Sequence, residues 1–343
     1  MGAGGEGLWR QAELTGLAMP LSRRQFVQLA AAIAAVPAFT SMAMAQTYPT
    51  RPVRFVISFP QGGPNDILGR LAAGWLSQRL GQPFEVENRP GRSGNTGTEI
   101  VVRAPADGYT VLLCGPANAI SGSLYANLGF NFLRDMTPVA GITREALVMV
   151  VHPSVPVRTV PEFIAYAKGN LDTLRMASTG NGSSPHVTGE LFKLMTGLPL
   201  EVVHYAGGGP ALRAMIAGEA QMMFEPMSAS IEPVRSGKLR ALAVTTAARS
   251  QALPEAPVMA DFVPGYEASA VTGIAVPKGT PAESVDALNR AMNAAFADPS
   301  MMAKLADTGG APLPGTAAEF ARLMAAETEK WGDVVRRAGI KAD

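Results

Sequence analysis

The segment that decides the fold is Phe59-Pro60-Gln61-Gly62-Gly63-Pro64-Asn65-Asp66, because it separates a predicted strand from a predicted helix. Before it, residues 52–58 (PVRFVIS) are rich in β-branched and aromatic side chains, which is typical of a strand. After it, residues 66–80 carry apolar side chains at helical spacing. Glycine and proline interrupt both patterns between them. The sequence therefore predicts a strand, a tight loop and a helix in direct succession.

The same succession recurs along the chain. Further strands are predicted at residues 84–87, 109–114, 146–151, 175–178, 201–204, 222–225 and 239–244. Further helices are predicted up to about residue 103 and at residues 161–168, 281–297, 301–306 and 317–338. Alternation of this kind favours an α/β fold with mixed, mostly parallel sheets flanked by helices.

Two sets of strands and helices followed by a helical tail indicate two lobes. We expect residues 46–146 and 250–343 to form one lobe and residues 147–249 to form the other. No flexible linker separates them, so the chain is expected to cross between the lobes on strands. Because ligands often bind at domain interfaces, this arrangement predicts a ligand cleft between the lobes.

Three glycine-rich loops, residues 59–66, 178–186 and 205–210, each join a predicted strand to a predicted helix. Glycine lets the backbone approach a ligand closely, and the N–H groups and dipole of a helix start attract anions. The loops contain no lysine or arginine, so N–H groups, hydroxyls or water would hold an anion. Ordinary turns are the alternative for any one loop. Asp66 is expected to stabilise a helix start, although it could also contact a ligand amine or hydroxyl.

Residues 1–45 have the order of parts found in an export signal. Ser22-Arg23-Arg24-Gln25-Phe26 is a twin-arginine pattern, an apolar run follows, and Ala43-Met44-Ala45 matches a signal-cleavage site. The apolar run is too short to span a membrane. We therefore expect export to the periplasm by a twin-arginine or general secretory signal, with cleavage after Ala45. An amphipathic first helix of the fold is the alternative, and Met19 could be the true start.

Composition excludes several classes of protein. The 343 residues include 29 Lys and Arg and 28 Asp and Glu, so there is no basic excess of the kind that nucleic-acid binding requires. Hydrophobic residues make up 47%, which excludes intrinsic disorder. The single cysteine, Cys114, cannot form an internal disulfide and follows an apolar run, so it is expected to be a buried thiol.

The motifs of common enzyme classes are missing from the sequence. It has no G-x-S-x-G nucleophile elbow, no phosphate-binding P-loop and no G-x-G-x-x-G after the first strand. Its three histidines, His152, His186 and His204, do not stand at a metal-ligand spacing. Ser183 or Ser184 with His186 could form a nucleophile pair, but a helix cap is the favoured interpretation. We expect no catalytic residue, no metal site and no cofactor.

The loops and several other stretches together resemble the Bug family, the extracytoplasmic solute receptors of tripartite tricarboxylate transporters. The resemblance covers essentially the whole chain after residue 45, and the motifs are specific in combination. They are Tyr48-Pro-Thr-Arg-Pro-Val-Arg, Phe59-Pro-Gln-Gly-Gly-Pro-Asn-Asp66, Glu87-Asn-Arg-Pro-Gly91, Ala106-Asp-Gly-Tyr-Thr110, Gly189-Glu-Leu-Phe192, Tyr205 with Gly207-Gly-Gly-Pro-Ala211, Gly237-Lys-Leu-Arg-Ala-Leu-Ala-Val244, Lys330-Trp331 and Ala338-Gly-Ile-Lys-Ala-Asp343.

The resemblance implies a two-lobed periplasmic-binding-protein fold, of type II-like flytrap form, that closes on a small carboxylate. The first and second loops would grip the ligand, often through water, Asn118 would line the far side, and the third loop would close the site. The implied ligand-binding residues are Phe59, Pro60, Gly62, Gly63, Asn65, Asp66, Asn118, Thr179, Gly180, Asn181, Gly182, Ser183, His186, Tyr205, Gly208, Gly209 and Glu225.

Three positions depart from the family pattern and bear on the ligand. Ala206 stands where members often have a basic or polar residue, and Glu225 stands where they usually have aspartate. Val271-Thr272 precede Gly273, where an aromatic residue is common. Because such positions tune the distal end of the ligand, the ligand could differ from the common dicarboxylates.

The leading hypothesis is a receptor that binds a di- or tricarboxylate, an amino-acid-like acid or an aromatic acid and delivers it to membrane permease subunits. The alternative is a periplasmic sensing module that signals to a receptor kinase. A periplasmic hydrolase is a third hypothesis, and it would require Ser183. The sequence leaves the identity of the ligand and the oligomeric state open.

Overall fold

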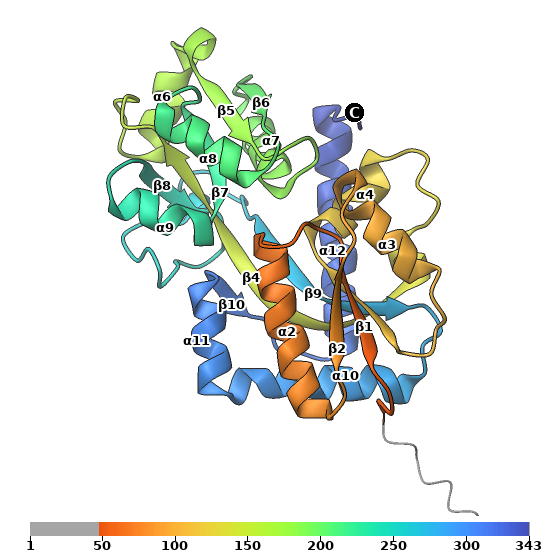
Figure 1. The fold of residues 1–343 in the computed structure, drawn as a ribbon. Helices are drawn as coiled ribbons and strands as arrows, with labels where there is room; N and C mark the ends of the chain where they lie inside the picture. The colour runs from red at the N-terminus through yellow and green to blue at the C-terminus, as the bar shows by residue number, and fades with distance from the viewer. Residues whose placement is uncertain (1–47, 343) are drawn as a thin grey trace, which may run out of the picture. The chain divides into compact units, whose positions relative to one another are not determined.

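Strand β4 (Met136–Val151) runs through the middle of the sheet in the computed structural model (Figure 1). The structure describes residues 48–342, all of which belong to one compact unit. The export signal predicted for residues 1–45 lies outside the described residues. Within them the strands form a ten-stranded sheet in the order β2-β1-β3-β9-β4-β7-β5-β6, with β8 and β10 also paired to β4. The other strands are β1 (Val53–Ile57), β2 (Phe84–Asn88), β3 (Thr110–Cys114), β5 (Arg175–Ser178), β6 (Glu201–His204), β7 (Met222–Pro226), β8 (Arg240–Val244), β9 (Ser269–Pro277) and β10 (Gly310–Pro312).

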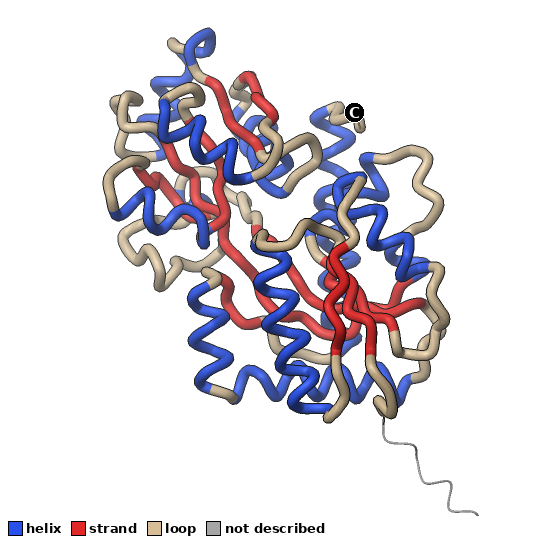
Figure 2. Tube along the Cα trace, viewed as in Figure 1, coloured by secondary structure: helices blue, strands red, loops and turns tan. Residues whose placement is uncertain are grey.

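Helices flank this sheet, which confirms the predicted α/β class (Figure 2). Apolar residues at helical spacing bury one side of each longer helix against the strands. The α-helices among the described residues are α2 (Pro64–Leu80), α3 (Asn95–Val102), α4 (Pro116–Leu124), α5 (Phe132–Asp135), α6 (Val160–Lys168), α7 (Ser184–Thr196), α8 (Gly208–Ala217), α9 (Met227–Arg235), α10 (Ala282–Ala294), α11 (Pro299–Asp307) and α12 (Ala317–Ala338).

Parallel pairing is limited to the two outer sets of strands, β2-β1-β3 and β7-β5-β6. Strand β4 pairs antiparallel with β7, β8, β9 and β10, and β3 pairs antiparallel with β9. The expectation of mostly parallel sheets was therefore wrong in this detail. The reason is that β4 carries the chain from the first set to the second and β9 carries it back, so the two strands lie side by side in opposite directions.

Strand β4 begins ten residues before the predicted start at residue 146. Its first half contains Pro138 and Gly141, which usually interrupt strands. The register against β9 shifts between Pro138 and Ala140 and again between Gly141 and Thr143, so bulges accommodate both residues. The extra length lets one strand take part in both halves of the sheet.

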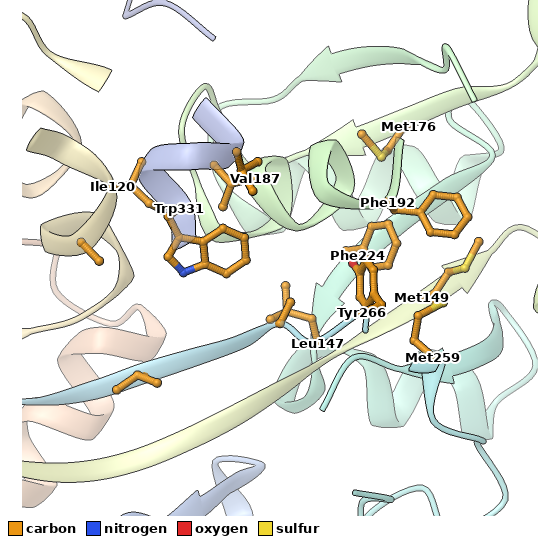
Figure 3. Packing of buried hydrophobic residues seen from close by; sticks show 14 of the residues in the cluster. Ile120, Leu147, Met149, Met176, Val187, Phe192, Phe224, Met259, Tyr266 and Trp331 are labelled. Carbon is orange, nitrogen blue, oxygen red and sulfur yellow. The ribbon is translucent and has the colours of Figure 1, made fainter. Parts of the chain in front are cut away.

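The largest apolar cluster joins residues from both halves of the sheet. Trp331 of α12 is 1% exposed and lies near Ile120 of α4, Val187 of α7 and Leu147 of β4 (Figure 3). Helix α12 contacts α4, α7 and β4. It therefore connects the half of the sheet that contains β2, β1 and β3 with the half that contains β7, β5 and β6, because α4 follows β3 and α7 follows β5.

The buried positions agree with the predicted core. Met215, Met222 and Met223, for which core packing was expected, are all 0% exposed. Cys114 is also fully buried, and burial raises the pKa of its thiol to about 12. A thiol in this state is inert, as expected for a structural cysteine.

Candidate functional site

The register of the strands places the predicted loops at the carboxyl ends of two sets of parallel strands. In the first half, Ile57 of β1 pairs with Leu113 of β3, so the first loop and the start of α4 leave neighbouring strands at the same level. In the second half, Ser178 of β5 pairs with His204 of β6. The second and third loops therefore also leave neighbouring strands together. Carboxyl ends of parallel strands are the usual place for ligands in α/β folds.

The first loop is shaped by Asp66, which lies in the first turn of α2 and is 3% exposed. Its Oδ2 atom accepts hydrogen bonds from the backbone N–H of Gly62 and from Nε of Arg70, both at 2.9 Å. Its Oδ1 atom accepts a bond of 2.8 Å from Nδ2 of Asn88. These donors, Arg70 above all, lower the pKa of the Asp66 carboxyl to about 2. The negative charge therefore supports the helix start and the loop, as predicted.

The start of α2 itself follows the expected pattern. Gly63 caps the helix in an extended conformation, and Pro64 follows as a first-turn residue, where the missing N–H costs nothing. Gly62 has a φ of +82°, which glycine adopts without strain. A Cβ atom built on Gly63 would lie 3.7 Å from the carbonyl oxygen of Pro60, an ordinary contact. Glycine is among the residues favoured at a helix N-cap, and it leaves the backbone of this position open to the surroundings.

The second loop ends at α7 in a network of local hydrogen bonds. Ser183 caps α7, and its Oγ accepts a bond of 3.3 Å from the backbone N–H of His186. The backbone N–H of Gly182 donates to Nδ1 of His186 at 2.9 Å. Because Nδ1 accepts, this tautomer carries its proton on Nε2. The favoured interpretation of Ser183 as a helix cap is confirmed. The His186 side chain stabilises the loop by accepting the hydrogen bond from Gly182.

The second loop also rests against α4. Gly182 has a φ of +68°, and a Cβ atom built on it would overlap the side chain of Leu124 and reach Ile120. Glycine is favoured here, because the left-handed backbone strains other residues and a Cβ atom would displace the Leu124 side chain. The loop that follows β5 is thereby brought against the helix that follows β3.

The third loop lies beside the second. The backbone N–H of Tyr205 donates to the carbonyl of Ser178 at 3.0 Å, and that of Gly207 donates back to Tyr205 at 2.8 Å. A Cβ atom built on Gly208 would contact Thr179 at 3.9 Å. The second loop thus contacts both α4 and the third loop. None of these contacts involves the first loop.

Asn118 is occupied by contacts within the first half. Its Oδ1 accepts the backbone N–H of Gly115 at 2.9 Å, and its Nδ2 donates to Oγ1 of Thr98 at 2.9 Å. The residue thus caps α4 and links it to α3. Its predicted place on the wall of a ligand site remains a prediction.

Glu225 is the most unusual of the predicted residues, because it is a carboxylic acid that is only 2% exposed. Its Oε2 atom has no hydrogen-bond partner among the described residues. Burial, reinforced by the charge of Glu145, raises the pKa of Glu225 to about 8. Glu145 was not among the predicted residues. Arg144 and Glu145 interrupt the long apolar run of residues 138–151, and this interruption is a sequence signal that could have pointed to Glu145.

His186 and His204 lie together where the second and third loops begin. Nδ1 of His204 lies 2.6 Å from Oγ of Ser178, and the rings of His186 and His204 meet edge to face at 4.5 Å. No group of three or more His, Cys, Asp or Glu side chains among residues 48–342 is placed to hold a metal ion. Within the same residues, no helix combines the length and apolar character that crossing a membrane requires.

Two surface cavities lie away from the predicted residues. One of about 450 Å³ is lined by residues that include Arg158, Arg240 and Glu255. The guanidinium of Arg240 already donates to the carbonyls of Val155 and Val157. The other, of about 430 Å³, is lined by residues from the end of α2 and the start of β2. Neither cavity involves a predicted ligand-binding residue.

Comparison with solved structures finds close likeness over the whole described unit. The R. palustris protein Rpa4515, solved with adipate, is 37% identical, with a TM-score of 0.78 over 86% of this chain and 99% of that chain. MatC (Rpa3494) from Rhodopseudomonas palustris, solved with bound malate, is 29% identical, with a TM-score of 0.74 over 84% of this chain and 100% of that chain. Both likenesses cover the two halves of the sheet together.

Comparison of sequences agrees with this result. Protein BugT of Bordetella pertussis is 35% identical over 300 residues, which are 87% of this chain and 92% of that protein. Residues 67–340 match the family model described as the tripartite tricarboxylate transporter family receptor. These matches confirm the resemblance to Bug proteins, and the chain belongs to the family of tripartite tricarboxylate transporter receptors.

Proposed function

We propose that this protein is a periplasmic receptor that binds a small carboxylate and delivers it to the permease subunits of a tripartite tricarboxylate transporter. The observation that carries the proposal is the likeness, over nearly the whole length of each, to one protein solved with adipate and another solved with malate. Both ligands are dicarboxylates. The receptor acts by binding and release, and it performs no chemical reaction on its ligand.

The ligand would bind between two lobes, residues 46–146 with 250–343 and residues 147–249. Support comes from the glycine-rich starts of α2, α7 and α8, which follow strands at two edges of the sheet. The loops contain no cationic side chain, so backbone N–H groups and hydroxyls would supply the hydrogen bonds to the carboxylate. Glu225 would lie at the distal end of the ligand.

This arrangement is energetically sufficient for a receptor. A dissociation constant of about 1 μM corresponds to about −8 kcal/mol. Hydrogen bonds to a charged carboxylate contribute roughly 1.5–3 kcal/mol each, so a few of them with burial of the ligand reach that value. Cationic side chains are not required.

The protein would reach the periplasm through its leader. The twin-arginine pattern at Ser22–Phe26 and the Ala43-Met44-Ala45 site support export and cleavage after Ala45. Mass spectrometry of the periplasmic protein tests this, because a mature chain that begins at Gln46 is expected. A mature protein that retains residues 1–45 would contradict it.

Thermal-shift screening followed by calorimetry tests the binding function. We expect adipate, malate or a related carboxylate to raise the melting temperature and to bind with one site per chain. Methyl esters of the same acids should fail to bind, because they carry no anionic group for the helix starts. Absence of binding across mono-, di- and tricarboxylates, amino acids and aromatic acids would overturn the proposal.

A further inference from the structure

Glu225 lies at the carboxyl end of β7, level with two predicted site residues. Met223 of β7 pairs with Ala177 of β5, and two residues further along the parallel strands this register sets Glu225 level with Thr179. The β5–β6 register sets Tyr205 level with Thr179 in turn. Glu225 therefore stands at the carboxyl end of β7, beside the carboxyl ends of β5 and β6, where the second and third loops begin.

Glu145 of β4 is the acid that acts on Glu225, and it has partners of its own. One of its carboxylate oxygens accepts the backbone N–H of Ser228 at 3.0 Å and the Oγ of Ser228 at 2.7 Å. Ser228 lies in the first turn of α9, where the helix dipole favours a negative charge. The two carboxyl groups therefore differ in their hydrogen-bond donors. Glu145 has the donors that an anion needs, whereas Oε2 of Glu225 has none among the described residues.

Two buried carboxyl groups that repel each other hold a proton more strongly than either would alone. The pKa of Glu225 is raised to about 8 by burial and by Glu145, so Glu225 is the protonated member at neutral pH. Among the described residues, Glu145 is the charged group that acts on it. The pKa of Tyr205, at the start of the third loop, is raised by burial and then by Glu219, and Arg175 opposes the shift.

We propose that Glu225, as a neutral carboxylic acid, donates a hydrogen bond to an oxygen of the ligand's second polar group, so that the site selects dicarboxylates over amino acids and monocarboxylates. The inference rests on the proposed function, since it assigns the distal end of the same ligand. An unsatisfied buried O–H gains a partner when that oxygen arrives.

The charge of the pair argues against a cationic ligand group. A neutral Glu225 offers no charge to an ammonium group. To pair with one it would have to ionise beside Glu145, and two neighbouring buried carboxylates are costly. A second carboxylate or another oxygen acceptor uses the proton that Glu225 already holds.

Calorimetry with matched ligands tests the assignment. Adipate and hexanoate have the same chain length and differ only in the second carboxylate, and 2-aminoadipate is adipate with one added amino group. The protein is expected to bind adipate at least tenfold more tightly than hexanoate or 2-aminoadipate. Glu225→Leu should reduce this preference for adipate over hexanoate about tenfold or more, because the donor is lost. Glu225→Gln keeps an N–H donor and should keep adipate affinity within about threefold.

The pH profile separates hydrogen-bond donation from a structural role. Adipate affinity of the unaltered protein should fall about tenfold between pH 7 and pH 9 as Glu225 loses its proton. Hexanoate affinity should stay constant, since its carboxylate is ionised throughout and does not meet Glu225. Glu225→Gln should remove the pH dependence. Glu145→Gln should move the loss of adipate binding to lower pH, because the neighbouring negative charge is gone.

Each contrary result has a distinct meaning. Tighter binding of 2-aminoadipate than of adipate, a flat pH profile, or equal losses in Glu225→Gln and Glu225→Leu would overturn the role of Glu225 and leave the receptor function intact. Failure of the unaltered protein to bind any carboxylate would overturn the receptor function and this inference with it.

Discussion

The side-chain amide of Asn181 donates a hydrogen bond of 2.6 Å to the main-chain oxygen of Lys341, 160 residues later in the chain. Asn181 lies in the second glycine-rich loop, and Lys341 follows α12. The loop is thus held from two sides, by the end of the chain and by His186. Its conformation therefore depends on a residue at the C-terminal end of the chain as well as on its own histidine.

Removal of this hydrogen bond should weaken ligand binding. Asn181→Ala is expected to raise the dissociation constant for adipate about two- to tenfold, the usual worth of one hydrogen bond. Deletion of residues 341–343 removes the acceptor and leaves Asn181 in place. If both variants lose affinity equally in calorimetry, Asn181 positions the loop. Normal binding by the truncated protein would instead indicate that Asn181 contacts the ligand directly.

Gly182 and Gly63 should respond differently to substitution. Gly182→Ala places a methyl group against Leu124 in a left-handed backbone conformation, so both stability and binding should fall. Gly63→Ala meets only an ordinary contact with Pro60 and should leave the melting temperature within about 2 °C. If Gly63→Ala nevertheless abolishes adipate binding, the backbone at Gly63 touches the ligand. Equal melting temperatures for the two variants would contradict the packing of the second loop against α4.

Acid should remove the contribution of Asp66. Its folded-state pKa is about 2, below the ordinary value of 3.8, so its stabilisation is complete above about pH 4 and is lost as the pH falls through about 2. The free energy of unfolding of the unaltered protein should exceed that of Asp66→Asn at pH 5. Urea unfolding at pH 5, 3 and 2 should show the difference shrinking. A constant difference would mean that the Asp66 charge adds nothing.

Neutralising Glu225 should stabilise the protein most at high pH. Its folded-state pKa is about 8, above the ordinary value of 4.5, so the cost of keeping it neutral grows as the pH rises from 4.5 to 8 and then levels off. Glu225→Gln should melt close to the unaltered protein at pH 5 and above it at pH 8. Differential scanning calorimetry without ligand checks this. A difference in melting temperature that does not change with pH would contradict the raised pKa of Glu225.

Trp331 should carry much of the packing between the halves of the sheet. Trp331→Ala is expected to lower the free energy of unfolding, measured with urea, by about 3–5 kcal/mol, because it would leave a cavity between α12 and the elements α4, α7 and β4. Trp331→Phe keeps most of the volume but removes the N–H that donates to Oε2 of buried Glu327 at 2.7 Å, at a cost of about 1–3 kcal/mol.

Trp75 is the matched control, since its Nε1 donates to a neutral acceptor, the carbonyl of Ala291, at 2.7 Å. Trp75 is also less buried than Trp331. Trp75→Phe should therefore cost less than Trp331→Phe. The reverse order would contradict the importance assigned to the bond between Trp331 and Glu327.

Elements with strong local signals were predicted well from the sequence. Helix α12 was predicted with its observed bounds, and the structure shows that a capping box of Thr316 and Glu319 starts it. The starts of α2 and α7 were found from glycine, proline and serine at the expected positions. Helix α9 was missed because Pro233 lies inside it, and the first half of β4 was missed because of Pro138 and Gly141.

Contacts between distant segments could not be predicted in the same way. Nothing local in the sequence indicates that Gly182 needs space for Leu124, or that Asn181 reaches Lys341. The effect of Glu145 on Glu225 likewise depends on the antiparallel pairing of β4 with β7, and the prediction of mixed, mostly parallel sheets did not say which strands pair. Long-range pairing sets these distances, and one sequence contains little information about it.

The shared strand β4 has a consequence for how the protein can be divided. It pairs with β9 and β10 over residues 136–146 and with β7 and β8 over residues 147–151, and the largest apolar cluster packs against both parts, so any cut between them would expose buried apolar surface. Neither half is expected to fold when expressed alone. The protein should melt in a single cooperative transition, and its two halves should behave as one evolutionary unit that cannot be exchanged piecewise between relatives.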